Sequence, residues 1–184
     1  IVINLAAQAG VRYSINFPDK YLNSNISGFF NILENSRKYN VKHLLFASTS
    51  SVYGLNKKFP VNEKFNTDKP LSFYAATKKS NEVMAHAYSN IYGLKCTSLR
   101  FFTVFGPYGR PDMALFKFVK AILNNKNIDL YNYGHHERDF TYVDDVVYCI
   151  SKLILSKKID NYDTFNIGSN NPIKLKKFVN IISK

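Results

Sequence analysis

The segment HLLFASTSS, residues 43–51, decides the fold class, because an apolar run passes directly into four consecutive hydroxyl side chains. An apolar run without alternation is typical of a strand that is buried on both faces of a parallel sheet. A helix is expected next over Ser72 to Tyr92, closed by Gly93, and another strand over Lys95 to Phe102. This order predicts a parallel α/β sheet, in which active groups gather at the carboxyl ends of the strands.

The alternation of strands and helices continues on both sides of this segment. Ile1 to Leu5 is predicted to be a buried strand, and Asp19 to Tyr39 a helix. A domain rarely begins in mid-strand, so we expect the sequence to be a fragment that lacks an N-terminal and a C-terminal part. After Gly106 the expected elements are a helix at about Asp112 to Asn124, a short strand near Asp129 to Tyr131, a helix at Val143 to Leu155, a strand at Thr164 to Ile167 and a last helix that runs to Lys184.

Composition argues against several functional classes. The 184 residues, 46% of them hydrophobic, suffice for one sizeable core, and the apolar stretches fall short of the roughly 20 residues of a membrane span. The net charge of +12 comes from dispersed lysines, so we expect no nucleic-acid groove, although the charge favours an anionic substrate. We expect no metal site, because His135 and His136 are adjacent rather than at ligand spacing. Cys96 and Cys149 are expected to be buried thiols in a reducing compartment.

The segment YAATK, residues 74–78, places the phenol of Tyr74 and the ammonium of Lys78 on one face of the expected helix. Two other pairs in the chain have this spacing, Tyr53/Lys57 and Tyr148/Lys152. Tyr53/Lys57 runs through Gly54 into a loop, and Tyr148/Lys152 has no hydroxyl-rich strand end at a suitable distance before it. Only Tyr74/Lys78 follows such a strand end by 25 residues. A nearby cation favours the phenolate, which can take a proton from a sugar hydroxyl while a hydride leaves the same carbon.

Five motifs in the same order resemble the UDP-glucuronate 4-epimerase branch of the extended short-chain dehydrogenase/reductase family, the NAD-dependent epimerases and dehydratases. They are LAAQAGVRYS (5–14), SSVYG (50–54), YAATKK (74–79), LRFFTVFGPYGRPDM (99–113) and RDFTYVDD (138–145). The resemblance implies part of a Rossmann-type doubly wound sheet over residues 1–105. Residues 106–184 would be mostly a truncated UDP-sugar lobe that partly returns to the Rossmann domain. It also implies bound NAD, a cytoplasmic location, a role in polysaccharide precursor synthesis and a homodimer in the full-length parent.

The resemblance also implies roles for individual residues. Tyr74 is the expected acid/base, Lys78 its partner and a ribose ligand, and Thr49 the hydroxyl that shares the hydrogen bond to the substrate O4. The positions expected to line the NAD site, besides Tyr74 and Lys78, are Ala6, Ala7, Asn25, Ser48 and Phe102. Arg110 and Arg138 match residues near the uridine diphosphate, where a guanidinium suits phosphate oxygens.

Thr103, together with Thr49, Ser50 and Ser51, resembles the cluster that receives the sugar carboxylate in uronate epimerases. Oxidation at C4 of a uronate creates a β-keto acid, which loses carbon dioxide readily when its carboxylate is free to rotate. Neutral hydroxyl donors would hold this carboxylate still, so the resemblance predicts C4 epimerisation of UDP-glucuronate or UDP-galacturonate through a 4-keto intermediate.

Several alternatives remain open at this point. The family's glycine-rich G-x-x-G-x-x-G fingerprint is expected before Ile1, so function is assigned to the full-length parent. A 4,6-dehydratase would carry Asp-Glu after Thr49, where this chain has Ser50 and Ser51. A decarboxylase, another nucleotide-sugar 4-epimerase and a non-catalytic NAD(H)-binding relative remain as alternatives. Taken singly, the hydroxyls could cap a strand end, Arg110 could form a surface ion pair, and Arg138 could pair with Glu137 or Asp139.

Overall fold

The computed structural model describes residues 1–56, 58–156 and 158–183, and it divides the chain into two units. The first unit consists of Ile1–Phe101 and Leu153–Asn166, and the second of Phe102–Lys152 and Ile167–Lys184. The first unit therefore takes residues from both sides of the division that was expected after residue 105. Lys57, the partner in one of the Tyr/Lys pairs, and Lys184, the expected end of the last helix, lie outside the described residues.

The sheet of the first unit contains four strands in the order β1 (Val2–Asn4), β2 (Leu44–Thr49), β3 (Cys96–Phe101) and β6 (Tyr162–Ile167). β1, β2 and β3 are parallel, with Ile3 opposite Leu45 and Leu45 opposite Thr97. Central β2 is almost wholly buried because strands flank both of its edges and helices cover it. The predicted parallel α/β sheet is thus confirmed, and the strand predicted over Lys95 to Phe102 ends at Phe101.

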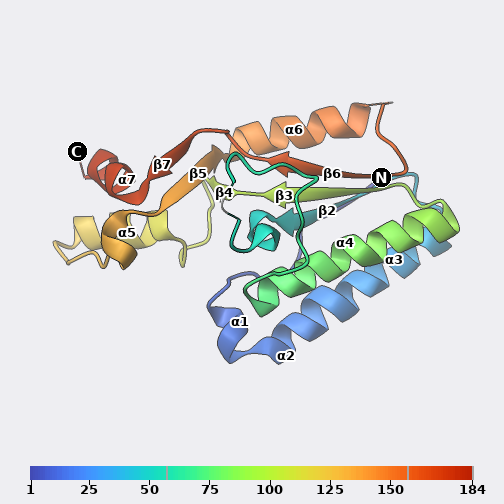
Figure 1. The fold of residues 1–184 in the computed structure, drawn as a ribbon, viewed down its shortest axis with the longest axis horizontal. Coiled ribbons are helices and arrows are strands. Elements are labelled where there is room, and N and C mark those ends of the chain that lie inside the picture. The colour runs from blue at the N-terminus through green and yellow to red at the C-terminus, as the bar shows by residue number, and fades with distance from the viewer. Residues whose placement is uncertain (57, 157, 184) are drawn as a thin grey trace. The chain divides into compact units, whose positions relative to one another are not determined.

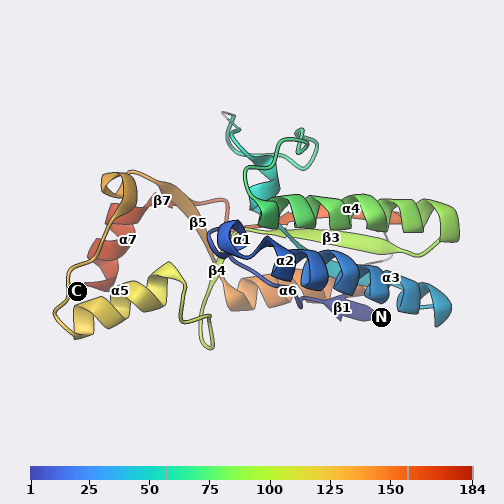
Figure 2. The ribbon, with the colours of Figure 1, turned by 90° about the horizontal axis from the view of Figure 1, so that it is seen from below.

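Two helices of the first unit lie side by side on one face of this sheet (Figures 1 and 2). They are α3 (Gly28–Lys38) and α4 (Phe73–Tyr92), and both contribute to a core with β2 and β3. This core consists of Phe29, Leu33, Leu44, Phe46, Ala85, Leu94 and Cys96. Burial of these apolar side chains holds α4 against the sheet and so fixes where its polar side chains lie.

The helix expected over Asp19 to Tyr39 is interrupted. It begins with α2 (Pro18–Tyr21), continues as a π-helical segment, η1 (Leu22–Ser27), and becomes α3 at Gly28. A short helix that the sequence did not indicate, α1 (Tyr13–Asn16), precedes it. π-helical turns are rare and occur frequently at functional sites.

The termini of α4 are set by local sequence. The hydroxyl of Ser72 accepts a hydrogen bond from the amide of Ala75 at 3.1 Å, which caps the first turn. At the other end Gly93 has φ +66°, and its amide donates to the carbonyl of Ser89 at 3.0 Å. Both ends agree with the predicted helix.

The second unit has a separate three-stranded sheet in the order β4 (Thr103–Phe105), β5 (Glu137–Tyr142) and β7 (Pro172–Lys174). β4 and β5 are parallel, and β5 and β7 are antiparallel. The helices are α5 (Ala114–Leu123), α7 (Leu175–Ile182) and α6 (Val143–Leu155), and the residues of α6 from Leu153 onward belong to the first unit.

The strand predicted near Asp129 to Tyr131 was wrong. That stretch leads into a 3₁₀ turn, η3 (Tyr131–Gly134), and the strand forms instead over Glu137–Tyr142. A short alternation of polar and apolar residues fits either structure, and a strand persists only where another strand pairs with it. β5 has such partners on both sides, β4 and β7.

Within the described part of the chain, no helix is both long and apolar enough to cross a membrane. In the same residues no three His, Cys, Asp or Glu side chains are grouped so that they could hold a metal ion.

The cap at Ser72 leads to a stability prediction for the full-length protein. Ser72→Ala removes the acceptor for the amide of Ala75 and is expected to lower the free energy of unfolding by about 1 kcal/mol, measured by urea denaturation. The matched control is Ser80→Ala on the same helix, because the Ser80 hydroxyl donates to the carbonyl of Ala76 on an exposed face and caps no helix end. It should change stability by less than about 0.5 kcal/mol. Equal losses in the two variants would contradict the capping role.

Candidate active site

The ammonium of Lys78 is buried against the carboxyl end of β2. Only 4% of Lys78 is exposed, and Nζ donates a hydrogen bond of 2.8 Å to the carbonyl oxygen of Ala47. Burial lowers the pKa of Lys78 to about 8, so the group is still mainly cationic at neutral pH. Burial of a cation costs desolvation free energy, and such a cost at the end of a parallel strand is more typical of a functional residue than of a purely structural one.

Tyr74 lies one turn before Lys78, in the first turn of α4. It is half-buried, and its ring meets that of Tyr21 edge to face with 6.1 Å between the centroids. α4 packs against both β2 and the 3₁₀ turn η2 (Ser50–Tyr53) that comes after it. Phenol, ammonium and strand end therefore belong to one region of the first unit.

The hydroxyls after β2 form an ordered turn. Thr49 is buried, and its Oγ1 accepts a hydrogen bond of 3.2 Å from the amide of Ser51, which caps η2. Ser50 and Ser51 are half-buried in the same turn. The capping interpretation and the substrate-binding interpretation are compatible, because a threonine oxygen that accepts one hydrogen bond can still donate its own proton.

Asn25 connects the segment after β1 to α4. Its side chain pairs with the backbone of Gln8, with distances of 2.8 Å from the Gln8 amide to Oδ1 and 3.0 Å from Nδ2 to the Gln8 carbonyl. Nδ2 also donates to Oγ1 of Thr77 at 3.0 Å, and Thr77 donates to the carbonyl of Tyr74 at 2.8 Å. The buried Asn25 thus links the chain at Gln8 to the first turn of α4.

A hollow of about 180 Å³ adjoins this connection. It is lined by Asn4, Ala6, Ala7, Ser24, Gly28, Phe29 and Ile32, which come from the end of β1, η1 and α3. The small side chains of Ala6 and Ala7 leave room beside the carboxyl end of β1. Two of the residues expected at the cofactor site thus line one hollow.

Ser48 is placed differently from its neighbours. It is 2% exposed, and its hydroxyl donates to Oε1 of Glu82 at 2.6 Å, between the sheet and α4. Its side chain is therefore occupied by an interaction within the protein, and its contact with NAD stays a prediction.

Glu82 and Arg100 form a buried ion pair between α4 and β3 that sequence reasoning missed. The Arg100 guanidinium binds the Glu82 carboxylate through two bonds, 2.9 Å from Nε to Oε1 and 2.8 Å from Nη2 to Oε2. Burial opposes the charge of Arg100, but the hydrogen bond and charge of Glu82 outweigh burial and raise the pKa of Arg100. Two signals could have found the pair: Glu82 lies one further turn beyond Lys78, and a buried strand that contains an arginine needs a buried partner.

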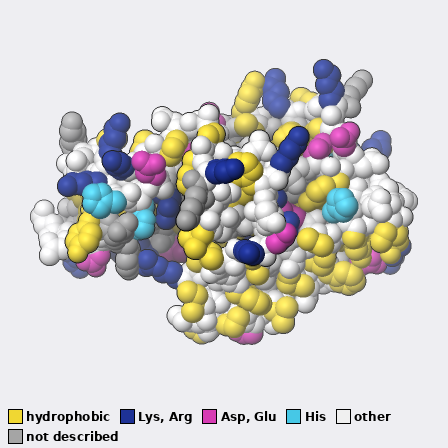
Figure 3. Space-filling view, in the orientation of Figure 1, with side chains coloured by type: hydrophobic (Ala, Val, Ile, Leu, Met, Phe, Trp, Pro, Cys, Tyr) yellow, Lys and Arg dark blue, Asp and Glu magenta, His cyan; other side chains and the backbone are white. Residues whose placement is uncertain are grey.

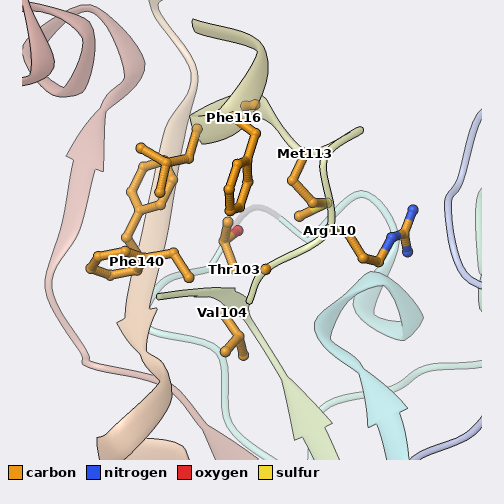
Figure 4. Close-up of a pocket in the computed structure, with 10 residues that line it drawn as sticks. Thr103, Val104, Arg110, Met113, Phe116 and Phe140 are labelled. Carbon is orange, nitrogen blue, oxygen red and sulfur yellow. The ribbon is translucent and has the colours of Figure 1, made fainter. Parts of the chain in front are cut away.

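The other expected residues lie in the second unit. Thr103, Arg110 and Phe140 help to line a small hollow of about 30 Å³, whose other lining residues are apolar and include Met113 and Phe116. Figure 4 shows the Arg110 guanidinium directed away from this apolar cluster. It forms a two-point ion pair with Asp112, which lowers the pKa of the Asp112 carboxyl.

Phe102 and Arg138 are also in the second unit. The amide of Phe102 donates to the carbonyl of Ile167 at 3.3 Å. Arg138 is exposed and donates to the backbone carbonyl of Glu137 at 3.0 Å. The structure describes each unit by itself, so the contribution of Phe102, Thr103, Arg110 and Arg138 to a site with Tyr74 stays a prediction.

The Tyr148/Lys152 pair has no comparable surroundings. Tyr148 is 62% exposed on α6, and the Lys152 ammonium lies 5.1 Å from the centre of its ring. This is a surface cation–π contact rather than a buried acid/base pair.

The chain is similar to known proteins along almost its whole length. The protein CapI of Staphylococcus aureus is 55% identical over 198 residues, and a probable UDP-glucuronate 4-epimerase of Rhizobium meliloti is 46% identical over 201 residues. These alignments cover 99% and 100% of this chain, and the chain spans 59% of the length of each relative. A crystal structure of UDP-glucuronic acid 4-epimerase from Bacillus cereus, with UDP-glucuronic acid and NAD, matches with a TM-score of 0.91 at 34% identity, over 99% of this chain and 58% of that one.

The sequence profile of the NAD-dependent epimerase/dehydratase family matches residues 1–168, which is most of the chain. The motifs around Tyr74 and Lys78, the parallel sheet beneath them and the solved structure with the same fold all lead to one assignment. The chain belongs to the NAD-dependent epimerase/dehydratase family.

Proposed function

We propose that the full-length protein is a nucleotide-sugar 4-epimerase that inverts C4 of a UDP-hexuronic acid, UDP-glucuronate or UDP-galacturonate, with bound NAD. The observation that carries the proposal is the buried ammonium of Lys78, bonded to the carbonyl of Ala47 and one helical turn from Tyr74. Such a pair at the carboxyl end of a parallel strand can move a proton to and from a sugar hydroxyl.

Tyr74 is the acid/base in this proposal. The Lys78 cation stabilises the phenolate, because an opposite charge nearby favours the ionised form. The phenolate takes the proton from O4, and Thr49 shares the hydrogen bond to that oxygen. When C4 is reduced again, Tyr74 returns the proton. Asn25 and Thr77 hold the helical turn that carries Tyr74, so the phenol is fixed before the sugar arrives.

The residues of the first unit fit a dinucleotide. Ala6 and Ala7 leave a hollow beside the end of β1, and the buried Asn25 orders the adjacent chain at Gln8. Lys78 would bind a ribose hydroxyl, and Phe102 of the second unit would line the site. When bound, NAD would accept a hydride from C4 and return it to the opposite face of the sugar. The expected glycine-rich fingerprint does not occur within the 184 residues.

The uronate preference is based on the hydroxyls beside Thr49. Ser50 and Ser51 are half-buried in η2 and present neutral donors rather than the Asp-Glu pair of a 4,6-dehydratase. Together with Thr103 they would hold the sugar carboxylate, and this restraint separates an epimerase from a decarboxylase. We assign Arg110 and Arg138 to the diphosphate, so the phosphate oxygens would share the Arg110 guanidinium with Asp112.

The proposal includes a homodimer and a cytoplasmic location. Hydrophobic side chains gather on the surface over α3 and α4 in the view of Figure 3. On these helices Phe30, Val83, Ile91 and Tyr92 are exposed. A second copy of the chain is the occupant that we propose for this surface, with the two helices paired across the interface.

The substrate is tested by incubating the full-length protein with UDP-glucuronate and separating the products. We expect UDP-galacturonate to appear without release of carbon dioxide, because the hydroxyl cluster restrains the carboxylate. UDP-glucose and UDP-N-acetylglucosamine serve as competing substrates. Stoichiometric carbon dioxide would favour the decarboxylase instead, and turnover of the neutral sugars alone would remove the uronate assignment.

Replacement of the proposed acid/base tests the mechanism. Tyr74→Phe is expected to lower kcat by roughly 10³-fold with little change in melting temperature, because only the proton-transfer group is lost. The matched control is Tyr148→Phe, which removes a phenol at the same spacing from a lysine on an exposed helix face. Its kcat should equal that of the unmodified enzyme. A Tyr74→Phe enzyme with normal kcat would rule out the proposed role.

The pH dependence of the reaction tests Lys78. Its pKa of about 8 lies below the ordinary lysine value because the group is buried, so the cation is present below about pH 8 and is lost above it. We therefore expect kcat/KM to fall as the pH rises through about 8. Lys78→Arg keeps a positive charge throughout this range and should move the alkaline limb to higher pH, even if its absolute rate is lower. An unmoved limb would mean that another group is responsible.

A further inference from the structure

The segment Ser48–Tyr53, which carries the hydroxyl cluster, is attached to the protein interior at both ends. At its start, Ser48 donates to Oε1 of Glu82 at 2.6 Å. At its end, the hydroxyl of Tyr53 accepts a hydrogen bond of 2.9 Å from Nη1 of Arg100. Between these two anchors lie Thr49, Ser50 and Ser51, the residues to which we assign the substrate hydroxyl and carboxylate.

Arg100 connects the two anchors. Nε and Nη2 bind the two carboxylate oxygens of Glu82, while Nη1 donates to Tyr53 and to the backbone carbonyl of Glu63 at 3.1 Å. Its guanidinium carbon also lies 4.9 Å from the centre of the Tyr53 ring. Arg100, Glu82 and Tyr53 are all buried, with exposed fractions of 4%, 3% and 7%. A planar guanidinium with fixed donors holds such partners at defined angles, which an ammonium would not do.

The hydroxyl of Tyr53 is also fixed in direction. Arginine can only donate, so the Tyr53 oxygen accepts from Arg100 and its own proton goes to Oδ1 of Asn166 at 2.7 Å. Burial raises the pKa of Tyr53, which keeps this phenol protonated and able to donate. Asn166 is itself held, because its amide donates to the Glu63 carboxylate at 2.8 Å and its Nδ2 to the carbonyl of Val61 at 3.2 Å.

We infer that Arg100 and Tyr53 are positioning residues, which hold the turn Thr49–Ser51 in the conformation that restrains the sugar carboxylate during oxidation at C4. The inference rests on the proposed function. Neither residue touches the substrate in this account. They act through the backbone of the Ser48–Tyr53 segment, whose two ends they and Glu82 fix.

The carboxylate needs restraint because its free movement relative to the C4 ketone would open a side reaction. In a 4-keto uronate, the C5–C6 bond can break, its electron pair passes into the C4–C5 bond to form an enolate on O4, and carbon dioxide leaves. A proton then adds to C5 to give a 4-keto pentose nucleotide. This step needs no further oxidant, and it is fastest when the breaking bond stands perpendicular to the plane of the ketone. If the turn Thr49–Ser51 shifts, the carboxylate is no longer held, and the C5–C6 bond can reach this perpendicular orientation.

The experiment compares Tyr53→Phe with the unmodified full-length enzyme. The substitution keeps the ring and removes the hydroxyl that Arg100 and Asn166 bind, while Nη1 of Arg100 keeps the carbonyl of Glu63. With carboxyl-labelled UDP-glucuronate, we expect kcat for epimerisation to fall about tenfold with KM changed by less than about twofold. A measurable fraction of turnovers should then release labelled carbon dioxide, which the unmodified enzyme is expected not to do. A residue that only stabilises the fold would not change this fraction.

Tyr88→Phe is the matched control, because it also removes a phenol with a 2.6 Å hydrogen bond, to Glu34, in the same unit but away from the turn. We expect normal kcat and no added carbon dioxide. Ser48→Ala, at the other anchor, is the second test variant. It removes the hydrogen bond from Ser48 to Glu82 but leaves both bonds between Arg100 and Glu82, so the buried ion pair stays intact. It should show the same product shift as Tyr53→Phe. Removing Arg100 or Glu82 alone would break the buried two-point ion pair and destabilise the fold, so neither substitution is used.

The outcomes separate the inference from the proposed function. If the unmodified enzyme epimerises UDP-glucuronate but both test variants give unchanged kcat and unchanged carbon dioxide, the positioning role is wrong and the function stands. If the enzyme inverts only neutral sugars, the uronate proposal fails, and the proposed restraint of the carboxylate fails with it. A normal kcat of Tyr53→Phe on those sugars would then also contradict the positioning role of Tyr53. If the unmodified enzyme inverts no UDP-sugar, both are overturned.

Discussion

The site depends on keeping a charged lysine under the end of a parallel sheet. Lys78 is 4% exposed, and the acceptor that the fold supplies for its ammonium is the carbonyl of Ala47. A charge in such surroundings is unfavourable unless it stays hydrogen-bonded, which requires the helix and the strand to be held rigidly against each other. The apolar core between β2, α3 and α4 provides this rigidity, since it fixes the helix that carries Lys78 against the strand that carries Ala47. Packing and chemistry are thus coupled in one helix: the face of α4 that buries Ala85 in the core also carries the amine.

Two polar connections extend this constraint to the rest of the first unit. On one side Asn25 joins Gln8 to Thr77 and so ties the chain after β1 to the turn that carries Tyr74. On the other side Glu82 and Arg100 tie α4 to β3 and to the ends of the turn after β2. Asn25, Glu82 and Arg100 are all buried, so the loss of any of their hydrogen bonds would leave a polar group unsatisfied in the interior. Each connection therefore favours one arrangement of the backbone groups that it joins. The hydroxyls, the phenol and the ammonium are held by different elements, yet these networks make their positions interdependent.

Local sequence was sufficient to predict those elements that local interactions determine. Ser72 and Gly93 set the ends of α4 within one residue, and the apolar run 44–46 predicted a strand that is buried on both faces. It was insufficient where distant partners decide. The π-helical turn around Asn25 depends on bonds to residues 17 and 52 positions away, which no window of helical periodicity contains. β5 opens with three consecutive charged residues and is a strand because β4 and β7 pair with it, while the stretch near Asp129 pairs with no strand in the described residues. The pair Tyr74/Lys78 was selected among three only by its context, since spacing alone fits Tyr148 and Lys152 equally well.

On the proposed function, proton transfer and substrate discrimination are tasks of different residues. Removal of a proton from a C4 hydroxyl makes the same demand for any hexose, so Tyr74 and Lys78 by themselves cannot distinguish a uronate from a neutral sugar. Discrimination requires groups that meet the substituent at C5, and neutral hydroxyls suit a carboxylate that must be held without being protonated, because each donates a hydrogen bond and none carries a proton acidic enough to transfer. The chain supplies such groups from the turn after β2 and from Thr103 at the start of β4, one in each unit. On the proposed function, specificity therefore arises from the hydroxyls assigned to the C5 substituent, whereas the proton transfer is assigned to Tyr74 and Lys78.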